Sequence, residues 1–208
     1  MSFHLSSATG SPFALYTTER SLTKHIEQFT NRFRELSGEA HVVARAEEAG
    51  HVVAGIIRDE AAECIALAHL DASLHDSVRA AIDPQMRVLA PPYPSKGLPE
   101  FLDAAQVGVT GVDWGIAETA TLVEICTDDA VRLVSGLPRT HIGIVRASTL
   151  VEKFTDAAEP MRKALADHPD GCSISFLSGP SRTGDIEMIL TLGVHGPEIA
   201  HAIIIEDC

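Results

Sequence analysis

A short loop with a single arginine is the clearest place where this sequence could bind a ligand. The loop reads Ser-Gly-Pro-Ser-Arg-Thr and follows the apolar run 173–177, which is predicted to be a strand. Arg182 is the only Lys or Arg after Lys163, and a guanidinium can hold a carboxylate or phosphate through two parallel hydrogen bonds. In open α/β sheets, ligands bind beyond the carboxyl ends of the strands, where we expect this loop to lie. The predicted ligand-binding residues are Gly179, Ser181, Arg182, Thr183, Asp185, Thr119 and Thr121.

The residues after this loop are predicted to form a helix over 184–194. Ile186, Ile189 and Leu190 recur at helical spacing, and Gly196-Pro197 ends the pattern. The unpaired N–H groups of its first turn would favour an anion held by Arg182. In a purely structural alternative, Arg182 instead pairs with a nearby carboxylate and fixes the loop. Its candidate partners are Asp185, Glu187 and Glu118.

Glu118 is the second candidate catalytic residue, beside Arg182. It lies among small residues in Ile-Ala-Glu-Thr-Ala-Thr, where a substrate can reach it easily. Burial could raise the pKa of its carboxyl group and suit it to acid–base or nucleophilic chemistry. The structural alternative is an ion pair between Glu118 and Arg182, and the sequence leaves both interpretations open.

Neither a cofactor nor a metal ion is predicted. Four cysteines occur, and no two form a C-x-x-C pair, whereas iron–sulfur clusters usually take several ligands from closely spaced cysteines. The ten histidines include no H-x-x-x-H or H-E-x-x-H motif, and the chain has no G-x-G-x-x-G fingerprint for a dinucleotide. The cysteine usage is typical of reduced intracellular thiols.

Composition excludes several classes of partner. The chain has 208 residues and a formal net charge of −13, which repels nucleic acids and anionic membranes. No apolar run approaches the ~20 residues of a membrane span. The first ten residues lack the basic and apolar regions of a secretory leader, so we expect a cytoplasmic protein with a polar N-terminal tail.

The order of predicted elements favours an α/β fold. Residues 17–37 are predicted to form an amphipathic helix, and from about residue 40 short apolar strands alternate with helices. This pattern predicts a mostly parallel sheet with helices on both faces. The proline-rich stretch 91–97 is a predicted loop, either a binding loop or a connector. We also predict a strand at 131–134, a kinked helix at 148–168 and a buried final strand at 202–205.

Three blocks of this sequence resemble one known family. They are Ser178-Gly-Pro-Ser-Arg-Thr-Gly-Asp-Ile-Glu with the later Leu192-Gly-Val-His-Gly-Pro, the stretch Gly108 to Leu122, and Leu137 to Val145. Together they resemble the lactate-utilisation (LUD) domain family, of the lactate utilisation protein C type. The family usually has Glu-Thr-Gly-Thr where this chain has Glu-Thr-Ala-Thr, so Ala120 replaces a glycine that could adopt a positive φ.

The resemblance implies both a fold and a role. The fold would be the one shared by sugar-phosphate isomerases, CoA transferases and 5-formyltetrahydrofolate cyclo-ligase. Residues 1–38 would be a tail with a helical appendage, and residues 39–208 the LUD-type α/β domain. The role would be a non-redox assembly or substrate-handling subunit of bacterial L-lactate oxidation, with iron–sulfur sibling subunits as partners. The alternatives are a small-molecule isomerase, acyl transferase or ligase acting at the Arg182 loop, and an interaction module or homo-oligomer that uses the 17–37 helix.

Overall fold

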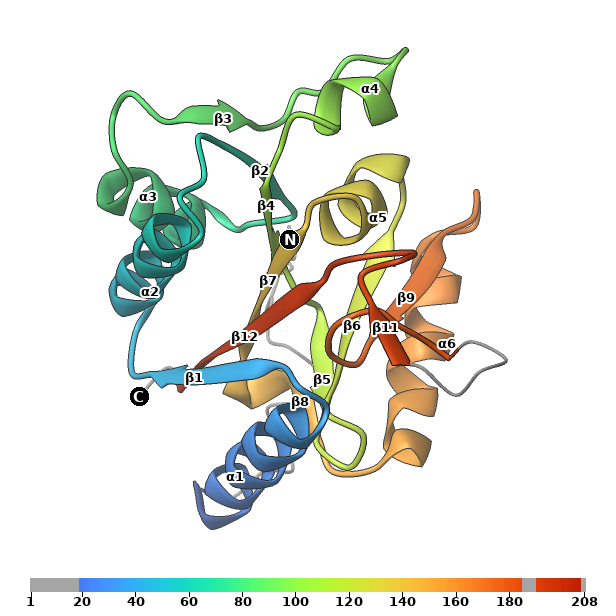
Figure 1. Ribbon diagram of the computed structural model, residues 1–208. Coiled ribbons are helices and arrows are strands. Elements are labelled where there is room, and N and C mark those ends of the chain that lie inside the picture. Colours follow the sequence, from blue (N-terminus) through green and yellow to red (C-terminus); the bar gives the residue numbers. More distant parts are fainter. Residues whose placement is uncertain (1–18, 185–189, 207–208) are drawn as a thin grey trace, which may run out of the picture.

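A six-stranded parallel sheet forms the centre of the molecule in the computed structural model, which describes residues 19–184 and 190–206 (Figure 1). Every neighbouring pair in this sheet is parallel, which confirms the predicted α/β class. Across the sheet, the strands are β1 (Glu39–Val43), β12 (Ile199–Ile205), β7 (Thr140–Arg146), β4 (Val107–Gly111), β2 (Cys64–Ala68) and β3 (Arg87–Leu89).

The inner strands are buried on both faces, as near-continuous apolar sequences require. All five residues of β2 are buried, and in β12 every residue after Ile199 is buried. The predicted burial of the final strand is therefore confirmed, although β12 begins three residues earlier than predicted. Because β12 lies between β1 and β7, strands from the two ends of the described chain lie side by side.

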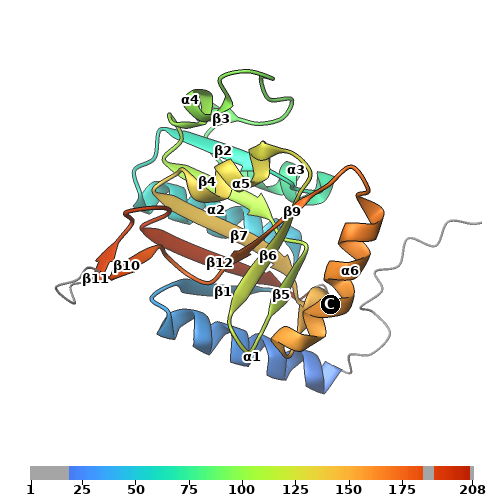
Figure 2. The ribbon, with the colours of Figure 1, turned by 90° about the vertical axis from the view of Figure 1, so that its right-hand side faces the viewer.

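Helices cover both faces of this sheet. On one face, α2 and α3 pack over a large aliphatic cluster that includes Val53, Ile65 and Ile203. On the other face lie α1, α5 and a second, smaller sheet (Figure 2). The helices are α1 (Glu19–Glu35), α2 (Ala46–Asp59), α3 (Ala72–Ala81), α4 (Leu98–Leu102), α5 (Asp129–Gly136) and α6 (Ala158–Asp167), with short 3₁₀ turns at 147–149 and 154–157. None of the helices within the described residues is long and apolar enough to cross a bilayer.

The second sheet has four strands and was only partly predicted. It comprises, in order, β8 (Leu150–Val151), β5 (Trp114–Ile116), β6 (Thr121–Cys126) and β9 (Ser173–Leu177), and β5, β6 and β9 pair antiparallel. Leu122 of β6 packs with Val145 and Ile204 of the large sheet. Gly143 of β7 permits this close approach, because a Cβ there would lie 2.5 Å from Leu122 Cδ1.

Helix α1 packs directly onto this arrangement. Phe29 and Phe33 are buried and stacked, with ring centroids 5.6 Å apart. Together with Ile26, they share one apolar cluster with residues of both sheets, including Leu122 and Ile204. The predicted helix over 17–37 is therefore present, and its apolar face is covered by the rest of the chain.

Three predicted elements are wrong. The expected helix over 184–194 is replaced by an antiparallel pair, β10 (Arg182–Gly184) and β11 (Leu190–Leu192), and residues 185–189 lie outside the described part. The expected strand at 131–134 is part of α5, since the Asp128 side chain accepts a hydrogen bond from Ala130 N and caps this helix. The expected helix over 148–168 contains β8 and a 3₁₀ turn before α6 begins at Ala158.

Candidate functional site

The Arg182 loop lies at a different edge from the one predicted. Its preceding strand, β9, belongs to the second sheet, so the loop does not continue a strand of the parallel sheet. Ser181 N donates to Pro197 O at 2.8 Å, and Gly193 N donates to Ser181 O at 3.0 Å. Pro197 comes just before β12 begins. The loop therefore lies at the amino edge of the parallel sheet, opposite the edge where ligands of such sheets usually bind.

Several predicted ligand-binding residues do come together near the start of this loop. A chain of hydroxyl groups runs from Thr119 Oγ1 to Thr121 Oγ1 and on to Ser178 Oγ, with 2.7 Å at each step. Gly179 follows with a φ of 83°, and a Cβ there would lie 3.2 Å from Leu36 O. The hydroxyl chain joins β6 to β9, and the glycine lets the loop pass close to the end of α1.

The two predicted catalytic residues do not form the ion pair that the structural alternative requires. Arg182 is exposed, and no ion pair links it to another residue of the described part. Glu118 is exposed rather than buried, and its Oε2 accepts a hydrogen bond from Phe154 N at 3.0 Å. The structural alternative of a Glu118–Arg182 salt bridge is therefore wrong. Asp185 and the side chain of Thr183 lie outside the described residues, and an anion at the loop stays a prediction.

A histidine–aspartate pair marks the carboxyl edge of the parallel sheet. His69 follows β2 with a φ of 55°, and its Nε2 lies 3.2 Å from Asp113 Oδ1, just beyond β4. Asp113 Oδ2 accepts from Ile125 N at 2.7 Å, which fixes the carboxylate. The hydrogen bond that His69 donates to the Asp113 carboxylate raises the pKa of His69, although partial burial opposes this shift. Sequence reasoning missed the pair, although His69 directly follows β2 and Asp113 lies two residues beyond β4.

A hollow of about 510 Å³ lies beside His69. It is bounded by the proline-rich loop after β3 and by the start of α5. Tyr93 of that loop donates its hydroxyl hydrogen to Leu67 O, and burial raises the pKa of this phenol. The proline-rich segment is thus held against the end of β2 and forms one wall of the hollow. Asp128 and Asp129 on the opposite wall give the hollow an acidic side.

Behind this edge, a buried polar relay joins the two sheets. Thr110 Oγ1 donates to Glu124 Oε1 at 2.5 Å and lies 2.8 Å from His141 Nε2. Burial raises the pKa of Glu124 to about 7 and lowers that of His141 to about 3. His141 is therefore neutral near pH 7, and its Nε2–H can donate to Thr110 while Thr110 donates to Glu124. Glu124 Oε2 is buried without a hydrogen-bond partner.

The His69–Asp113 pair suits proton transfer more than anion binding. His69 is oriented by Asp113 through Nε2, so its Nδ1 remains as the ring position for a reacting group. A histidine held in this way is the usual pattern of a general acid or base. Within the described residues, no serine or threonine hydroxyl and no cysteine thiol is hydrogen-bonded to His69, so the pair does not extend to a nucleophile.

Comparisons with known proteins agree with the motifs. The model of the family described as "LUD domain" matches residues 26–205, which is most of the chain. The chain belongs to the LUD domain family. The family resemblance seen in the sequence is therefore confirmed, and the match includes most of α1.

Two curated relatives of this LUD chain carry the same name. A lactate utilization protein C from Shouchella clausii is 41% identical over 113 residues, covering 54% of this chain and 49% of that protein. One from Macrococcus caseolyticus is 42% identical over 109 residues, covering 52% and 47%. The chain spans about half the length of the curated relatives it matches.

A solved structure shares the LUD fold described above. The crystal structure of a DUF162 family protein from Deinococcus radiodurans superposes with a TM-score of 0.65 at 25% sequence identity. The alignment covers 89% of this chain and 98% of that one. The parallel sheet and its helices therefore recur in a second protein.

Ala120 of this LUD domain adopts the conformation expected of a glycine. Its φ is 49°, although an L-residue in the left-handed region costs roughly 1–2 kcal/mol. Its methyl group is buried in the cluster that contains Leu122 and Ile204. Ala120 therefore adopts a positive φ that a glycine would adopt without strain, and burial of its methyl group offsets part of the strain.

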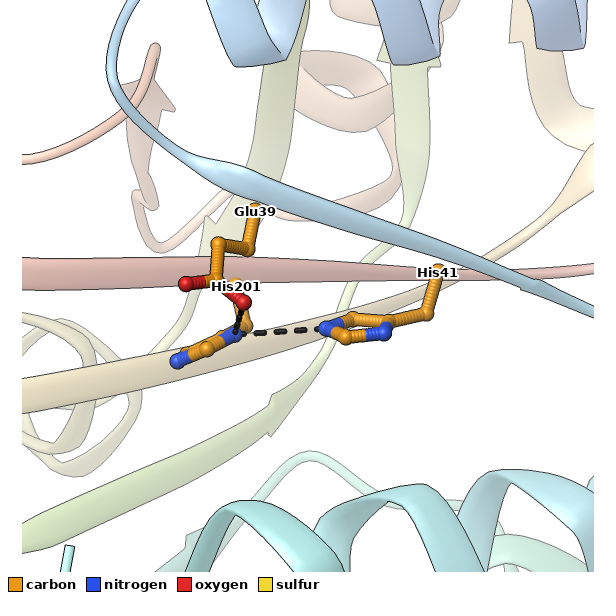
Figure 3. A group of neighbouring side chains, drawn as sticks. All are labelled: Glu39, His41 and His201. Atoms are coloured by element: carbon orange, nitrogen blue, oxygen red, sulfur yellow. Dashed lines mark hydrogen bonds and ion pairs between the residues drawn. The ribbon is translucent and has the colours of Figure 1, made fainter. Parts of the chain in front are cut away.

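One group of metal-ligand side chains occurs among the described residues of the LUD domain. Glu39, His41 and His201 meet on neighbouring strands at the amino edge of the parallel sheet (Figure 3). Burial lowers the pKa of both histidines, so both are mainly neutral near pH 7. Sequence reasoning missed the group, because nothing in the sequence shows that β12 lies next to β1.

Proposed function

We propose that this chain is a non-redox component of a bacterial L-lactate utilisation system, acting in assembly or substrate handling beside iron–sulfur partner proteins. The observation that carries the proposal is the family match over residues 26–205, together with relatives named lactate utilization protein C. Because the chain spans about half of those relatives, the activity of the whole system is inferred from a partial match.

The arrangement of cysteines supports the non-redox part of the proposal. Cys64 lies in β2, Cys126 ends β6, and Cys172 lies just before β9. In the described part of the chain, no cysteine belongs to a group of three or more side chains that could share a metal ion. Cys64 and Cys126 are buried, and burial raises the pKa of both thiols, which disfavours the thiolate that a cluster requires.

Deletion of the gene tests the proposed role. In the bacterium that encodes this chain, we expect the deletion strain to lose growth on L-lactate as sole carbon source and to grow normally on glucose. Reintroduction of the wild-type gene should restore growth on lactate. Normal growth of the deletion strain on L-lactate, with no second LUD gene present, would overturn the proposal.

The non-redox assignment needs a separate measurement on the purified chain. We expect iron analysis to find no stoichiometric iron, and the chain alone not to oxidise L-lactate. Co-expression with the iron–sulfur proteins of the same system should yield a complex on size-exclusion chromatography. Stoichiometric iron in the isolated chain would contradict the assignment even if the deletion strain fails on lactate.

A second candidate function is acid–base chemistry on a small molecule, as in an isomerase, acyl transferase or ligase. The observation that favours it is the His69–Asp113 pair beside a hollow at the ligand-binding edge of the sheet. The Arg182 loop, with Ser181 and Thr183, is the other place where such a substrate could be held. Both assignments require a ligand that stabilises the folded chain.

A thermal-shift screen separates the two places. Lactate, inorganic phosphate, sulfate and an acyl-CoA are tested against the wild type, His69→Gln and Arg182→Ala. If the stabilisation is lost only in His69→Gln, the compound binds in the hollow. If it is lost only in Arg182→Ala, the compound binds at the loop, and its affinity should fall roughly 10- to 150-fold in that variant. If no compound stabilises the wild type, or both variants keep the full response, the second candidate function is wrong.

A further inference from the structure

Two neighbouring strands place three ligand side chains on one face of the parallel sheet. Glu39 and His41 are two residues apart in β1, so both point to the same side of the strand. In the parallel register, Glu39 lies opposite His201 of β12. The three side chains therefore converge although His41 and His201 are 160 residues apart in the chain (Figure 3).

The distances between their donor atoms suit one metal ion. His41 Nε2 lies 3.3 Å from His201 Nδ1, and His201 Nδ1 lies 3.7 Å from Glu39 Oε2. All three donor atoms lie within 4.8 Å of one another. Tetrahedral zinc with bonds of about 2.0–2.1 Å needs its ligand atoms about 3.3–3.4 Å apart. The histidine pair already has this spacing, and the Glu39 side chain, 70% exposed, is free to rotate inward.

The surroundings of these side chains favour a cation. They line a hollow of about 310 Å³ together with Asp59, Glu60 and Glu198. Arg139 neutralises part of this charge, with its guanidinium 2.8 Å from Glu60 and 2.9 Å from Glu198. Arg34, which is bonded to Ala40 O, adds a weaker positive charge near His41. The carboxylates still outnumber the guanidinium groups around the hollow.

We propose that Glu39, His41 and His201 bind a divalent transition metal ion of the Zn²⁺ class at the amino edge of the sheet. Two imidazole nitrogens and one carboxylate are a donor set that zinc accepts with a fourth, open position for water or a substrate oxygen. The hollow leaves room for that fourth ligand. Without a metal, a hydrogen bond between the two imidazoles would explain their contact. The two interpretations, a metal site and a simple hydrogen bond, therefore predict different results in a metal titration.

This site is separate from the hollow beside His69. His69 lies beyond the carboxyl end of β2, whereas Glu39 begins β1 and His201 lies near the start of β12. The metal site shares its edge with the Arg182 loop, because Pro197 binds Ser181 and the next residue, Glu198, lines the hollow. Because the metal-site inference is argued only from the distances and charges around Glu39, His41 and His201, it does not depend on the proposed role in lactate utilisation.

Titration of the metal-free chain tests the proposal. The full chain is prepared without an affinity tag, treated with a chelator and titrated with Zn²⁺ by calorimetry, and with Co²⁺ by visible absorption, which reports tetrahedral coordination. The variants are Glu39→Gln and His41→Asn, both at solvent-accessible positions, and His201→Asn. His51→Asn is the matched control, because His51 is an exposed histidine of α2, outside the proposed ligand set.

We expect one equivalent of Zn²⁺ to bind to the wild type and to His51→Asn with equal affinity. Removal of even an outer-shell partner lowers the affinity of a metal site roughly 10- to 100-fold. Because Glu39→Gln and His41→Asn each remove a direct ligand, we expect their Zn²⁺ affinity to fall at least as much. Thermal melts without metal show that the variants remain folded. The proposal is overturned if the wild type binds no stoichiometric metal, or if both surface variants keep wild-type affinity.

Discussion

The carboxyl group of Glu124 on β6 is buried and accepts a hydrogen bond from Thr110 of β4, so it lies where the two sheets meet. Glu124 is fully buried, and the cost of burying its charge outweighs the stabilisation that the hydroxyl groups of Thr110 and Ser135 give to the carboxylate, so the neutral form is favoured. The pKa rises from its ordinary 4.5 to about 7 in the folded chain. As the pH rises from 4.5 to 7, the unfolded chain gives up this proton while the folded chain retains it, so stability falls.

Glu124→Gln should remove this pH dependence. A glutamine of the same shape cannot ionise, so the free energy of unfolding of the wild type should fall relative to the variant by up to about 3 kcal/mol between pH 4.5 and pH 7. His141, whose low pKa has the opposite effect, is present in both proteins and cancels. Urea denaturation across this pH range measures the difference. A constant difference at all pH values would contradict the shifted pKa.

At the residue scale, contacts between residues that are close in the sequence are easier to predict than contacts between distant strands. Thr119 and Thr121 lie within hydrogen-bond distance because they are two residues apart, whereas the bond from Thr121 to Ser178 joins segments 57 residues apart. The contact between His69 and Asp113, and that between Glu39 and His201, depend on which strands are neighbours. The period of a strand fixes the face that a side chain occupies, but strand order is decided by packing of the whole sheet.

Among the elements, the turn at Gly179 connects the second sheet to the amino edge of the large one. Its φ of 83° is costly for any residue with a Cβ, and that Cβ would lie 3.2 Å from Leu36 O. The backbone oxygen of Leu36 follows α1 directly and has little freedom to move. A side chain at Gly179 must therefore displace either the loop or the end of the helix.

Gly179→Ala should lower the free energy of unfolding by about 1–2 kcal/mol. Gly136→Ala is the matched control, because Gly136 ends α5 with no atom within 4 Å of its would-be Cβ. There alanine should be neutral or stabilise the helix by up to about 1 kcal/mol. Chemical denaturation of both variants measures these effects. Equal stabilities of the two variants would contradict the constraint at Gly179.

The wrong element predictions have local physical causes. Over 184–194, the apolar residues fit a helical period, whereas Leu190-Thr-Leu also alternates as a strand, and pairing with Arg182-Thr-Gly decided the outcome. Aspartate is common both in turns and at helix N-caps, so Asp128 alone does not distinguish a turn before a strand from the start of a helix. In the structure its side chain caps α5. Long inner strands such as β2 and β12 were predictable because their apolar runs leave little choice.

On the scale of the whole molecule, α1 contributes to the core between the two sheets. The proposed division of the chain at residue 38 treats this helix as an appendage. Phe29, however, has no exposed surface and stacks on Phe33 within the cluster that holds Leu122 and Ile204. The division can therefore be tested through the stability of the entire fold.

Phe29→Ala should cost about 3–5 kcal/mol, because a large cavity would open between α1 and the sheets. Phe154→Ala is the control, since Phe154 is 50% exposed and its loss should cost much less. Urea unfolding followed by circular dichroism measures both values. A single transition shifted by Phe29→Ala would show that α1 unfolds with the α/β domain, whereas an unchanged main transition would support a separate appendage.

The position of β12 between β1 and β7 has a consequence for the order of events on the ribosome. Strands β2, β3 and β4 are adjacent in both chain and sheet, so they can associate while the chain is still growing. Strand β1 is made before them, yet among the described strands its hydrogen-bonded neighbour in the large sheet is β12, the strand of that sheet that lies furthest from it along the chain. Until residues 199–205 emerge, the backbone of β1 has no partner among the described strands of that sheet, and α1 lacks part of the surface it covers. Until β12 is made, the nascent chain therefore carries an unpaired strand and a partly uncovered apolar helix, which makes this segment a natural target for chaperones that bind exposed apolar residues.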